Sequence, residues 1–438
     1  MTPRPASKQA FFQRATRKGA LGGFIVIIVL VSPVPPGANS ALAAMIWTSL
    51  LSLMLGAFLA LPASTAPLQA GRHRAVFLLC GVAMTFALMQ TVPLGFASPL
   101  PRAIPRPDTI SLVPQASRQG VLRLISFAIL FALTLEICTG GQRIRHMRWL
   151  LFTGVALHAL AALAMLNLFG DSALWGEKPA YAGFATGSFV NRNAFATYLG
   201  MGLVLGLSII LEDEHRRMMP RAVLLPGLFV IVIALLSTGS RMGVVASLSA
   251  AIVCITLMKG ARSLRWIALT LGLALACFLI FGQSLAERAL HTGHSLNTRM
   301  ILWRQVGAMI ADRPLAGFGL NSFAPAFQLY HRPPLSSGVT WDHAHSTYLT
   351  WWVELGVIAG SLPMVAIGLA GRRTAKSLHA HPYGRGPGAA GVSALILGVT
   401  HSLVDFSLEV LPTTFLFVTL IAMGMSRPTL PDKPASEE

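Results

Sequence analysis

The sequence predicts an all-α polytopic membrane protein, and three observations support this fold class. Of the 438 residues, 54% are hydrophobic and only 11% are charged, whereas soluble domains carry about 25% charged residues. The hydrophobic residues lie in runs of about twenty, the length that a helix needs to cross a hydrocarbon core about 30 Å thick. Glycine and proline are spread along the chain without a three-residue period, which excludes a collagen-like protein. We therefore do not expect a soluble enzyme.

The hydrophobic runs predict about twelve transmembrane helices. Residues 1–20 form a basic head, residues 21–282 hold nine spans, residues 283–346 form one large loop, residues 347–425 hold three more spans, and residues 426–438 form a tail. The expected spans are residues 21–37, 41–61, 75–92, 120–138, 149–169, 193–211, 222–238, 242–258, 264–282, 347–370, 388–404 and 409–425.

The positive charge of the chain is explained by topology. The formal net charge is +18, which in a soluble chain would indicate a nucleic-acid partner. Here the basic residues concentrate in the short loops on the same side as the N-terminus, which the positive-inside rule places in the cytoplasm. We expect both termini in the cytoplasm, no nucleic-acid partner, and the large loop on the other face. In a bacterium that face of the inner membrane is periplasmic.

No cofactor or metal is expected. The four cysteines, at positions 80, 138, 254 and 277, lie inside hydrophobic runs, where a thiol packs as a small apolar group. The outer loops hold no D-x-D pair that would bind a divalent metal. The chain also lacks a P-loop and a G-x-G-x-x-G phosphate cradle.

The large loop contains the clearest periodic pattern outside the spans. Residues 297–312 carry apolar side chains at positions 302, 306, 309 and 310, which is the spacing of an amphipathic helix. We expect a short helix at the outer membrane surface with its apolar side toward the membrane. Arg299, Trp303 and Val306 would share one stripe of this helix, and Arg304 would point elsewhere.

Two histidines at the end of this loop are candidates for proton transfer. His343 and His345 come directly before the tenth span, and histidine is suited to accept a proton near neutral pH. They also fit an interfacial histidine or, less well, a metal-ligand pair, because no further ligand cluster accompanies them. Asp342 would cap the following helix or orient a base, and capping is the simpler interpretation.

Basic and amide side chains on the outer face are candidates for anion binding. Arg241 lies in a short outer turn, and a guanidinium can hold phosphate oxygens in a bidentate manner. Arginines at span ends also serve as interfacial anchors, and Arg299 and Arg304 would equally meet anionic head groups. Asn191, Arg192 and Asn193 open the sixth span, where they would cap the helix or bind an anion. The lone polar residues His158, Glu354 and His401 lie inside hydrophobic runs and receive no role.

Five outer-face segments together resemble the O-antigen ligase and polymerase family. These bacterial membrane glycosyltransferases use glycans carried on undecaprenyl diphosphate. The segments cover roughly residues 187–360, and their order and common face make the set specific. They are G-x-F-x-N-x-N at Gly187–Asn193, S-x-x-S-R at Ser237–Arg241, T-R-x-x-x-W at Thr298–Trp303, P-L-x-G-x-G at Pro314–Gly319, and H-A-H-S-x-Y-L at His343–Leu349. One departure is Ser346, where family members commonly have asparagine.

The resemblance implies a GT-C-like bundle of about twelve helices with a large periplasmic loop over a lipid-facing cavity. It implies that Arg241 and Arg299 hold the diphosphate of the donor without a metal, and that His345 activates the acceptor hydroxyl. Other candidates for substrate binding are His343, Arg304, Asn191, Arg192 and Asn193.

The acceptor stays open at this point. A lipid A core would make the protein a ligase, a second lipid-linked repeat unit would make it a polymerase, and a pilin-like protein would make it a protein O-oligosaccharyltransferase. The first two are the commoner roles in the family. A secondary transporter is the competing class, but the spans are nearly free of central charges and show no repeat between halves.

Overall fold

The computed structural model shows a helical protein. It describes residues 5–35, 40–61, 68–93, 108–178, 180–212, 218, 220–260, 293–338, 340–378 and 385–427, with short pieces between 263 and 275. Throughout these ranges the regular elements are helices, apart from an isolated bridge between Ala173 and Gly176. The elements are α1 (Pro5–Val31), α2 (Ala41–Leu59), α3 (Gln69–Arg72), α4 (Arg74–Met89), α5 (Pro114–Ile137), α6 (Gly141–Asn167), α7 (Arg192–Ile210), α8 (Arg221–Ser237), α9 (Arg241–Lys259), α12 (Gly293–Asp312), α13 (Phe323–Gln328), α14 (Thr347–Ser377), α15 (Gly386–His401), the 3-10 helix η3 (Ser407–Glu409) and α16 (Leu411–Met425).

Several of these helices are long and apolar enough to cross a membrane. Among the described residues these are α2, α5, α6, α7, α9 and α14, and the shorter apolar helices are α4, α8 and α16. Helix α15 follows the eleventh predicted span closely, whereas α1 overlaps the first predicted span only over residues 21–31 and begins within the predicted basic head. The ninth predicted span, residues 264–282, lies largely outside the described residues. The chain is therefore a membrane protein with multiple spanning helices, and the count of twelve stays a prediction.

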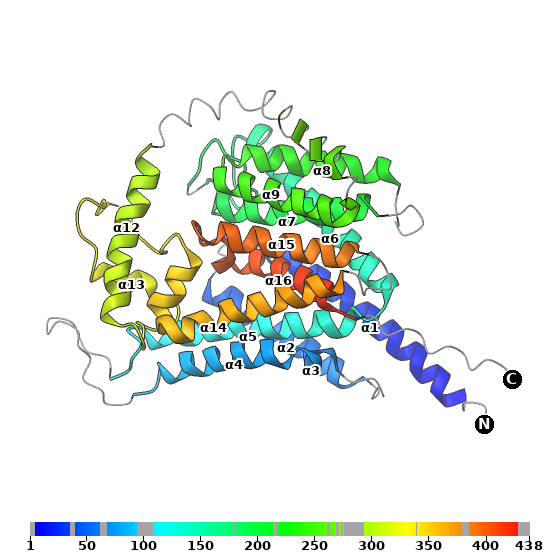
Figure 1. Cartoon of the computed structure of the whole chain (residues 1–438), viewed down its shortest axis with the longest axis horizontal. Helices are drawn as coiled ribbons and strands as arrows, with labels where there is room; N and C mark the ends of the chain where they lie inside the picture. The colour runs from blue at the N-terminus through cyan, green and yellow to red at the C-terminus, as the bar shows by residue number, and fades with distance from the viewer. Residues whose placement is uncertain are drawn as a thin grey trace.

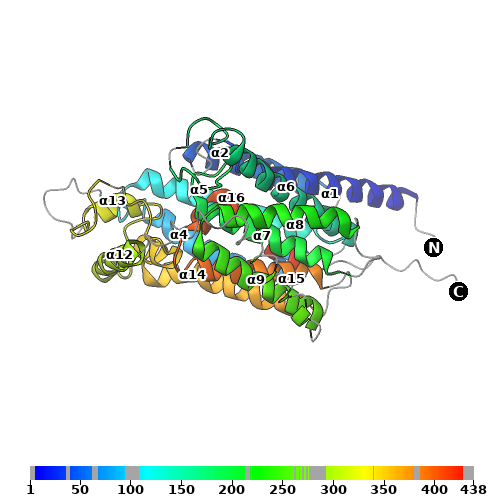
Figure 2. The ribbon, with the colours of Figure 1, turned by 90° about the horizontal axis from the view of Figure 1, so that it is seen from above.

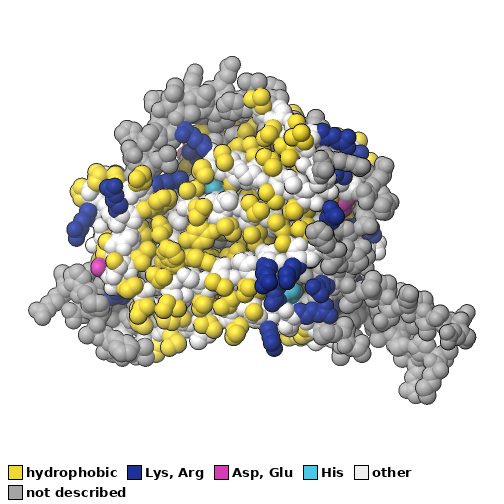
Figure 3. Space-filling view, viewed as in Figure 1, with side chains coloured by type: hydrophobic (Ala, Val, Ile, Leu, Met, Phe, Trp, Pro, Cys, Tyr) yellow, Lys and Arg dark blue, Asp and Glu magenta, His cyan; other side chains and the backbone are white. Residues whose placement is uncertain are grey.

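The long helices run side by side along one axis (Figures 1 and 2). Helices α12 and α13 lie at one end of this bundle, and α1 begins at the opposite end. Hydrophobic side chains cover the middle of the face in Figure 3, while Lys and Arg gather toward its two ends. This distribution is typical of a surface that faces lipid, with charged groups kept near water.

Helix α7 lies in the core of the bundle because it is apolar all round. It packs against α6, α8, α9 and α15, and every residue from Ala194 to Ile210 is buried. Small residues allow this close approach. A Cβ at Gly200 would lie only 2.1 Å from Ser247 Oγ, too close for any side chain, and glycines at such positions are typical of closely packed membrane helices. The N-terminus of α7 is thereby fixed at the end of the bundle that carries α12.

Helix α12 exists as predicted but packs differently. It begins at Gly293 rather than 297, and Leu302, Val306 and Met309 are fully buried. They belong to a small core that includes Phe318, Phe323, Phe327 and Val353 of the same chain. The expectation that this apolar stripe faces the membrane is therefore wrong, because the large loop folds its own apolar core under the helix.

A backbone latch ties the large loop to α14. Helix α14 is kinked at Gly356, where φ is 73°. The amides of Phe318 and Gly319 donate to the carbonyls of Val353 and Glu354, both at 2.9 Å, and the amide of Val357 donates to Pro314 at 2.7 Å. The kink frees these carbonyls from intrahelical bonding, so the P-L-x-G-x-G segment fixes the loop against the helix that follows the two histidines.

Candidate active site

His343 and His345 lie in the extended segment before α14, against the ring of Phe406. The His343 imidazole stacks on this ring with centroids 3.8 Å apart, and the His345 imidazole meets it edge-on at 5.3 Å. The turn that carries Phe406 is tied to α14, because the amide of Thr347 donates to the carbonyl of Ser402 at 3.1 Å. Ser346, the departure from the family pattern, donates its hydroxyl to the same carbonyl at 3.3 Å.

Helix α12 is docked directly onto the two-histidine segment. The indole Nε1 of Trp303 donates to the carbonyl of Ala344 at 2.9 Å. Arg299 lies one turn before Trp303 on the same face, since residues four apart in a helix are neighbours. The T-R-x-x-x-W spacing therefore brings the half-buried Arg299 toward His345, while Arg304 is exposed.

Arg241 and Arg299 both act on Arg192 through their charges, and Arg299 also acts on His345, while the Arg241 side chain is exposed. Arg192 opens α7, Arg241 opens α9, and both Arg241 and Arg299 repel the charge of Arg192 electrostatically. The Arg192 guanidinium also lies over the ring of Phe184, 4.2 Å from its centroid. Gathering like charges costs free energy unless an anion neutralises them. The N-termini of α7 and α9 add positive dipole ends at the same place.

His345 is held as a neutral imidazole. The pKa of His345 is lowered to about 4: burial is the largest cause, the charges of Arg299 and His343 add to the lowering, and Asp405 and Glu409 oppose it. Its backbone adopts a φ of 50°, a region that side-chain-bearing residues rarely occupy outside functional sites and turns. Its Nδ1 atom is buried and has no hydrogen-bond partner in the described part of the chain. A neutral imidazole can accept a proton.

The asparagines at the start of α7 have structural partners. Asn191 Oδ1 accepts from the amides of Asn193 and Ala194 at 2.7 and 3.1 Å, so Asn191 caps the helix. Asn193 Nδ2 donates to Asp405 Oδ1 at 2.8 Å. The prediction that Asp342 caps α14 is wrong, because the residue at the N-cap position is Ser346. Asp342 is exposed and acts on His343 through its charge.

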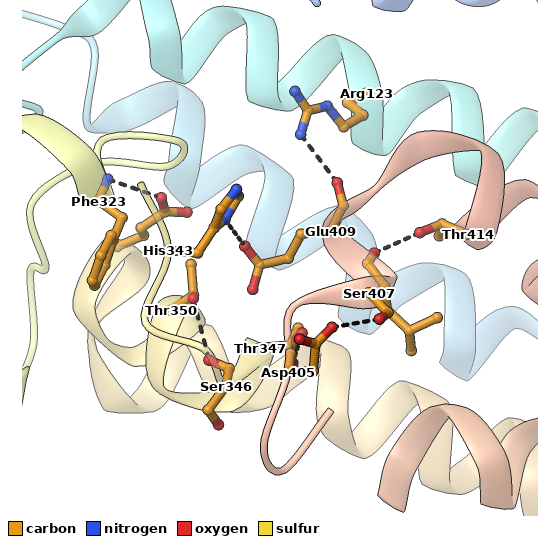
Figure 4. A network of polar contacts seen from close by, with 12 residues as sticks. Arg123, Phe323, His343, Ser346, Thr347, Thr350, Asp405, Ser407, Glu409 and Thr414 are labelled. Carbon is orange, nitrogen blue, oxygen red and sulfur yellow. Dashed lines mark hydrogen bonds and ion pairs between the residues drawn. The ribbon is translucent and has the colours of Figure 1, made fainter. Parts of the chain in front are cut away.

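Sequence reasoning missed two buried carboxylates between the last two helices. Asp405 is 1% exposed and accepts hydrogen bonds from Asn193 and from the Ser407 hydroxyl. Glu409 accepts from His343 Nδ1 at 2.9 Å, and its backbone carbonyl accepts from Arg123 at 3.4 Å (Figure 4). The available signal was Asp405 in the brief outer turn between the last two predicted spans and Glu409 at the first position of the twelfth span.

Glu409 also sets the charge of His343. Burial acts to lower the pKa of His343, but the hydrogen bond and charge of Glu409, with the charges of Asp342 and Glu354, outweigh it and raise the pKa above the usual 6.5. The two neighbouring histidines are thus pushed in opposite directions. Such a separation is typical of sites that assign different protonation states to similar groups.

The three lone polar residues are hydrogen-bonded within the bundle. His158 Nε2 lies 2.8 Å from the carbonyl of Leu30, and His401 Nδ1 lies 2.6 Å from Thr197 Oγ1. Glu354 Oε1 accepts from the amide of Phe323 at 3.1 Å. Within the described ranges, no three His, Cys, Asp or Glu side chains are grouped as metal ligands.

The fold and this site define a helical membrane protein with a cluster of arginines beside a histidine at one end of its bundle. Residues 226–364 match the family model described as O-antigen ligase. The matched segment takes in most of α8, then α9, α12, α13 and the first half of α14, and it includes Arg241, Arg299, His343 and His345. This confirms the resemblance over that segment, and the family implies a glycosyltransferase that acts on lipid-linked glycans. No curated protein matches the chain in sequence.

Proposed function

We propose that this protein transfers a glycan from undecaprenyl diphosphate to an acceptor hydroxyl at the periplasmic face of the bacterial inner membrane. The observation that carries the proposal is the electrostatic interaction of Arg192 with Arg241 and Arg299, together with that of Arg299 with the His345 imidazole, whose pKa is lowered. In this proposal the chain forms a twelve-span, GT-C-like bundle with both termini in the cytoplasm. It serves in lipopolysaccharide or surface polysaccharide assembly, as a ligase or polymerase rather than a protein O-oligosaccharyltransferase.

The chemistry follows from where charge develops. The acceptor oxygen attacks the anomeric carbon of the donor sugar, the bond from that carbon to the diphosphate oxygen breaks, and direct displacement inverts the anomeric centre. The departing diphosphate gains negative charge, which Arg241 and Arg299 stabilise, and the charge of Arg192 adds to theirs. Fixed guanidinium groups do this without reorganising during the reaction, and they need no metal. His345 takes the proton from the acceptor hydroxyl as the new bond forms.

The low pKa of His345 fits this sequence of events. Without donor, neighbouring cations help to keep the imidazole neutral. A bound diphosphate would offset those cations, so the pKa of His345 would rise when the donor arrives. The base would then be unprotonated on binding and a stronger proton acceptor during transfer.

The test uses the full chain in lipid nanodiscs, with undecaprenyl diphosphate glycans extracted from the producing bacterium. Arg241→Ala and His345→Ala should each slow glycan release from the diphosphate by on the order of a hundredfold. Arg332→Ala is the matched control, because Arg332 is exposed in the same large loop and should leave the rate unchanged. Uptake of a solute without any covalent change would instead identify a transporter and contradict the proposal.

A further inference from the structure

A second group of arginines lies at the end of the bundle away from the two histidines. Helix α14 begins next to His345 and ends at Ser377, and Arg373 lies near that second end. Arg72 is the last residue of α3, and Arg427 follows α16. Figure 1 places α3 toward the end of the bundle where α1 begins, and Lys and Arg side chains gather toward that end in Figure 3. Arg72, Arg373 and Arg427 are here called the second arginine cluster.

Hydrogen bonds hold this cluster in place. Arg373 Nη1 donates to the carbonyl of Arg72 and to Nδ1 of His73, both at 2.6 Å. Gln69 Nε2 donates to the carbonyl of Arg427 at 3.1 Å, which ties the end of α16 to α3. All three arginines of the cluster act on His73 through their charges. Holding like charges together costs free energy unless an anion neutralises them.

His73 adds a buried hydrogen-bond donor to the cluster. A guanidinium can only donate, so Nδ1 of His73 accepts from Arg373 and the ring proton is on Nε2. The pKa of His73 is lowered to about 4: burial is the largest cause, and the charges of the cluster add to the lowering. His73 is 7% exposed, and its Nε2 has no hydrogen-bond partner among the described residues. A buried donor without an acceptor costs free energy, and a phosphate oxygen would satisfy it.

An apolar groove begins at the same place and follows α4. Its volume is about 990 Å³, and the described residues that line it lie on α3 and α4. They start with Ala70 and Arg74, which flank His73 in sequence, and end at Met89. Leu78 and Val82 in the middle of the groove are exposed, as is Met89. The groove therefore connects the second arginine cluster to a surface of α4 that is suited to lipid chains.

The groove and the cluster together match an anionic phospholipid. Helix α4 has 16 residues and rises about 24 Å, which exceeds the about 15 Å of hydrocarbon in one leaflet, so one acyl chain fits along it. A guanidinium holds phosphate oxygens through two parallel hydrogen bonds, and basic pockets between membrane helices bind anionic head groups. A zwitterionic lipid would bring its ammonium group to the same arginines, so charge disfavours it.

We propose that the second arginine cluster and the α4 groove form one binding site for an anionic phospholipid. Its phosphate lies against Arg74 and the cluster and accepts a hydrogen bond from Nε2 of His73. One acyl chain lies along α4 beside Leu78 and Val82. In the expected topology this lipid belongs to the cytoplasmic leaflet. The assignment goes beyond the proposed function, because the proposed transfer of the glycan uses none of these residues.

Native mass spectrometry of the full chain, released from detergent micelles, counts bound lipids and does not depend on catalysis. With dioleoyl phosphatidylglycerol or dioleoyl phosphatidylcholine supplied, we expect one phosphatidylglycerol to bind at least about tenfold more tightly than phosphatidylcholine. Inorganic phosphate at the same concentration should not displace it, because phosphate has no chain for the groove. Equal affinities for the two lipids would overturn the proposal, and displacement by phosphate would show that the site takes a free anion instead.

Neighbouring arginines on α14 separate the site from general surface charge. Arg373→Gln should lower the affinity for phosphatidylglycerol at least about tenfold. Arg372→Gln is the matched control, because Arg372 is exposed and is not one of the three arginines that act on His73; it should change the affinity by less than about twofold. Equal losses in the two variants would show only general attraction of anions and would refute the site. If Arg373→Gln fails to fold, Arg74→Gln at an exposed position of the groove has the same expected direction.

Glycine substitutions test the groove. Gly81 lines it, and an added Cβ there meets no atom within 4 Å, so a larger side chain fills the groove without a clash. Gly81→Leu should weaken the binding of phosphatidylglycerol severalfold. Gly56→Leu on α2 is the control, because an added Cβ at Gly56 also meets no atom within 4 Å, and it should leave the affinity unchanged. Equal affinities of the two variants would exclude the groove as the place of the acyl chain.

Discussion

Replacing Arg299 with alanine should affect both the rate and its pH dependence. Arg299 projects from α12, which Trp303 docks onto the two-histidine segment at 2.9 Å. Its charge reaches both Arg192 in the cationic cluster and His345. Arg299→Ala therefore removes the phosphate ligand that we propose and one of the cations that lower the pKa of His345.

The two effects have separable magnitudes. Loss of one fixed donor to a developing anion costs about a hundredfold to a thousandfold in kcat, or about 2.7 to 4 kcal/mol. A pKa of about 4 against the usual 6.5 corresponds to about 3 kcal/mol in favour of the neutral His345. Burial is the largest cause of that shift and remains in the variant. The pKa of His345 should therefore rise in Arg299→Ala without returning to 6.5.

The assay is the pH profile of kcat/KM for glycan release in nanodiscs, because this parameter reports the pKa values of the free enzyme. In the native protein the rate should fall only as the pH approaches about 4, where His345 becomes protonated. In Arg299→Ala the acidic limb should move to higher pH, while Arg332→Ala leaves it in place. Arg299→Lys should keep the native limb but lose rate, since an ammonium retains the charge and not the bidentate geometry.

Two results would refute this reasoning. An acidic limb at or above pH 6.5 in the native protein would assign the proton transfer to His343, whose pKa is raised, instead of His345. The second result is an acidic limb of the pH profile that does not move in Arg299→Ala, together with a rate loss below about tenfold. It would show that the charge of Arg299 does not act on the reaction. Arg304→Ala should lose less rate than Arg299→Ala in either case, because Arg304 is exposed.

Three further substitutions test the frame around the site. Gly356→Ala should lower the midpoint of thermal unfolding, because the φ of Gly356 is 73° and an added Cβ would lie 2.4 Å from the carbonyl oxygen of Leu315. Gly368→Ala on the same helix is the control, because an added Cβ there meets no atom within 4 Å. Equal midpoints for the two variants would count against the latch. Arg148→Ala leaves the buried Glu212 carboxylate, 2.7 Å away, without its ion-pair partner and should lower the free energy of unfolding by about 3 to 5 kcal/mol. Replacing both residues with apolar ones should cost less stability, and an equal or larger loss would contradict this reasoning. Asp405→Asn weakens the tie to Asn193, worth about 1.5 to 3 kcal/mol, and should lower both the midpoint and the rate of glycan release; an unchanged midpoint would exclude that tie.

Local pattern was enough to predict most of the helices and the main candidate residues. Runs such as residues 193–211 are long and apolar enough to form a helix whatever their neighbours are, and α7 follows that range closely. The spacing of Arg299 and Trp303 placed both on one stripe, which the structure retains. The stripe of α12 was located correctly and its partner was not, because periodicity defines an apolar face but not what covers it.

The amino-acid sequence by itself determined that the chain is a helical membrane protein and that its arginines and histidines concentrate in a few outer segments. Only the tertiary structure decided that Phe406 lies against both imidazoles, that Glu409 bonds to His343, and that His343 lines an apolar cavity among α4, α5, α14 and α16. The physical reason is that composition and periodicity act over neighbouring residues, whereas burial and charge at a site depend on groups far apart in the chain. Glu409 follows His343 by 66 residues, and packing of the helices between them sets their distance.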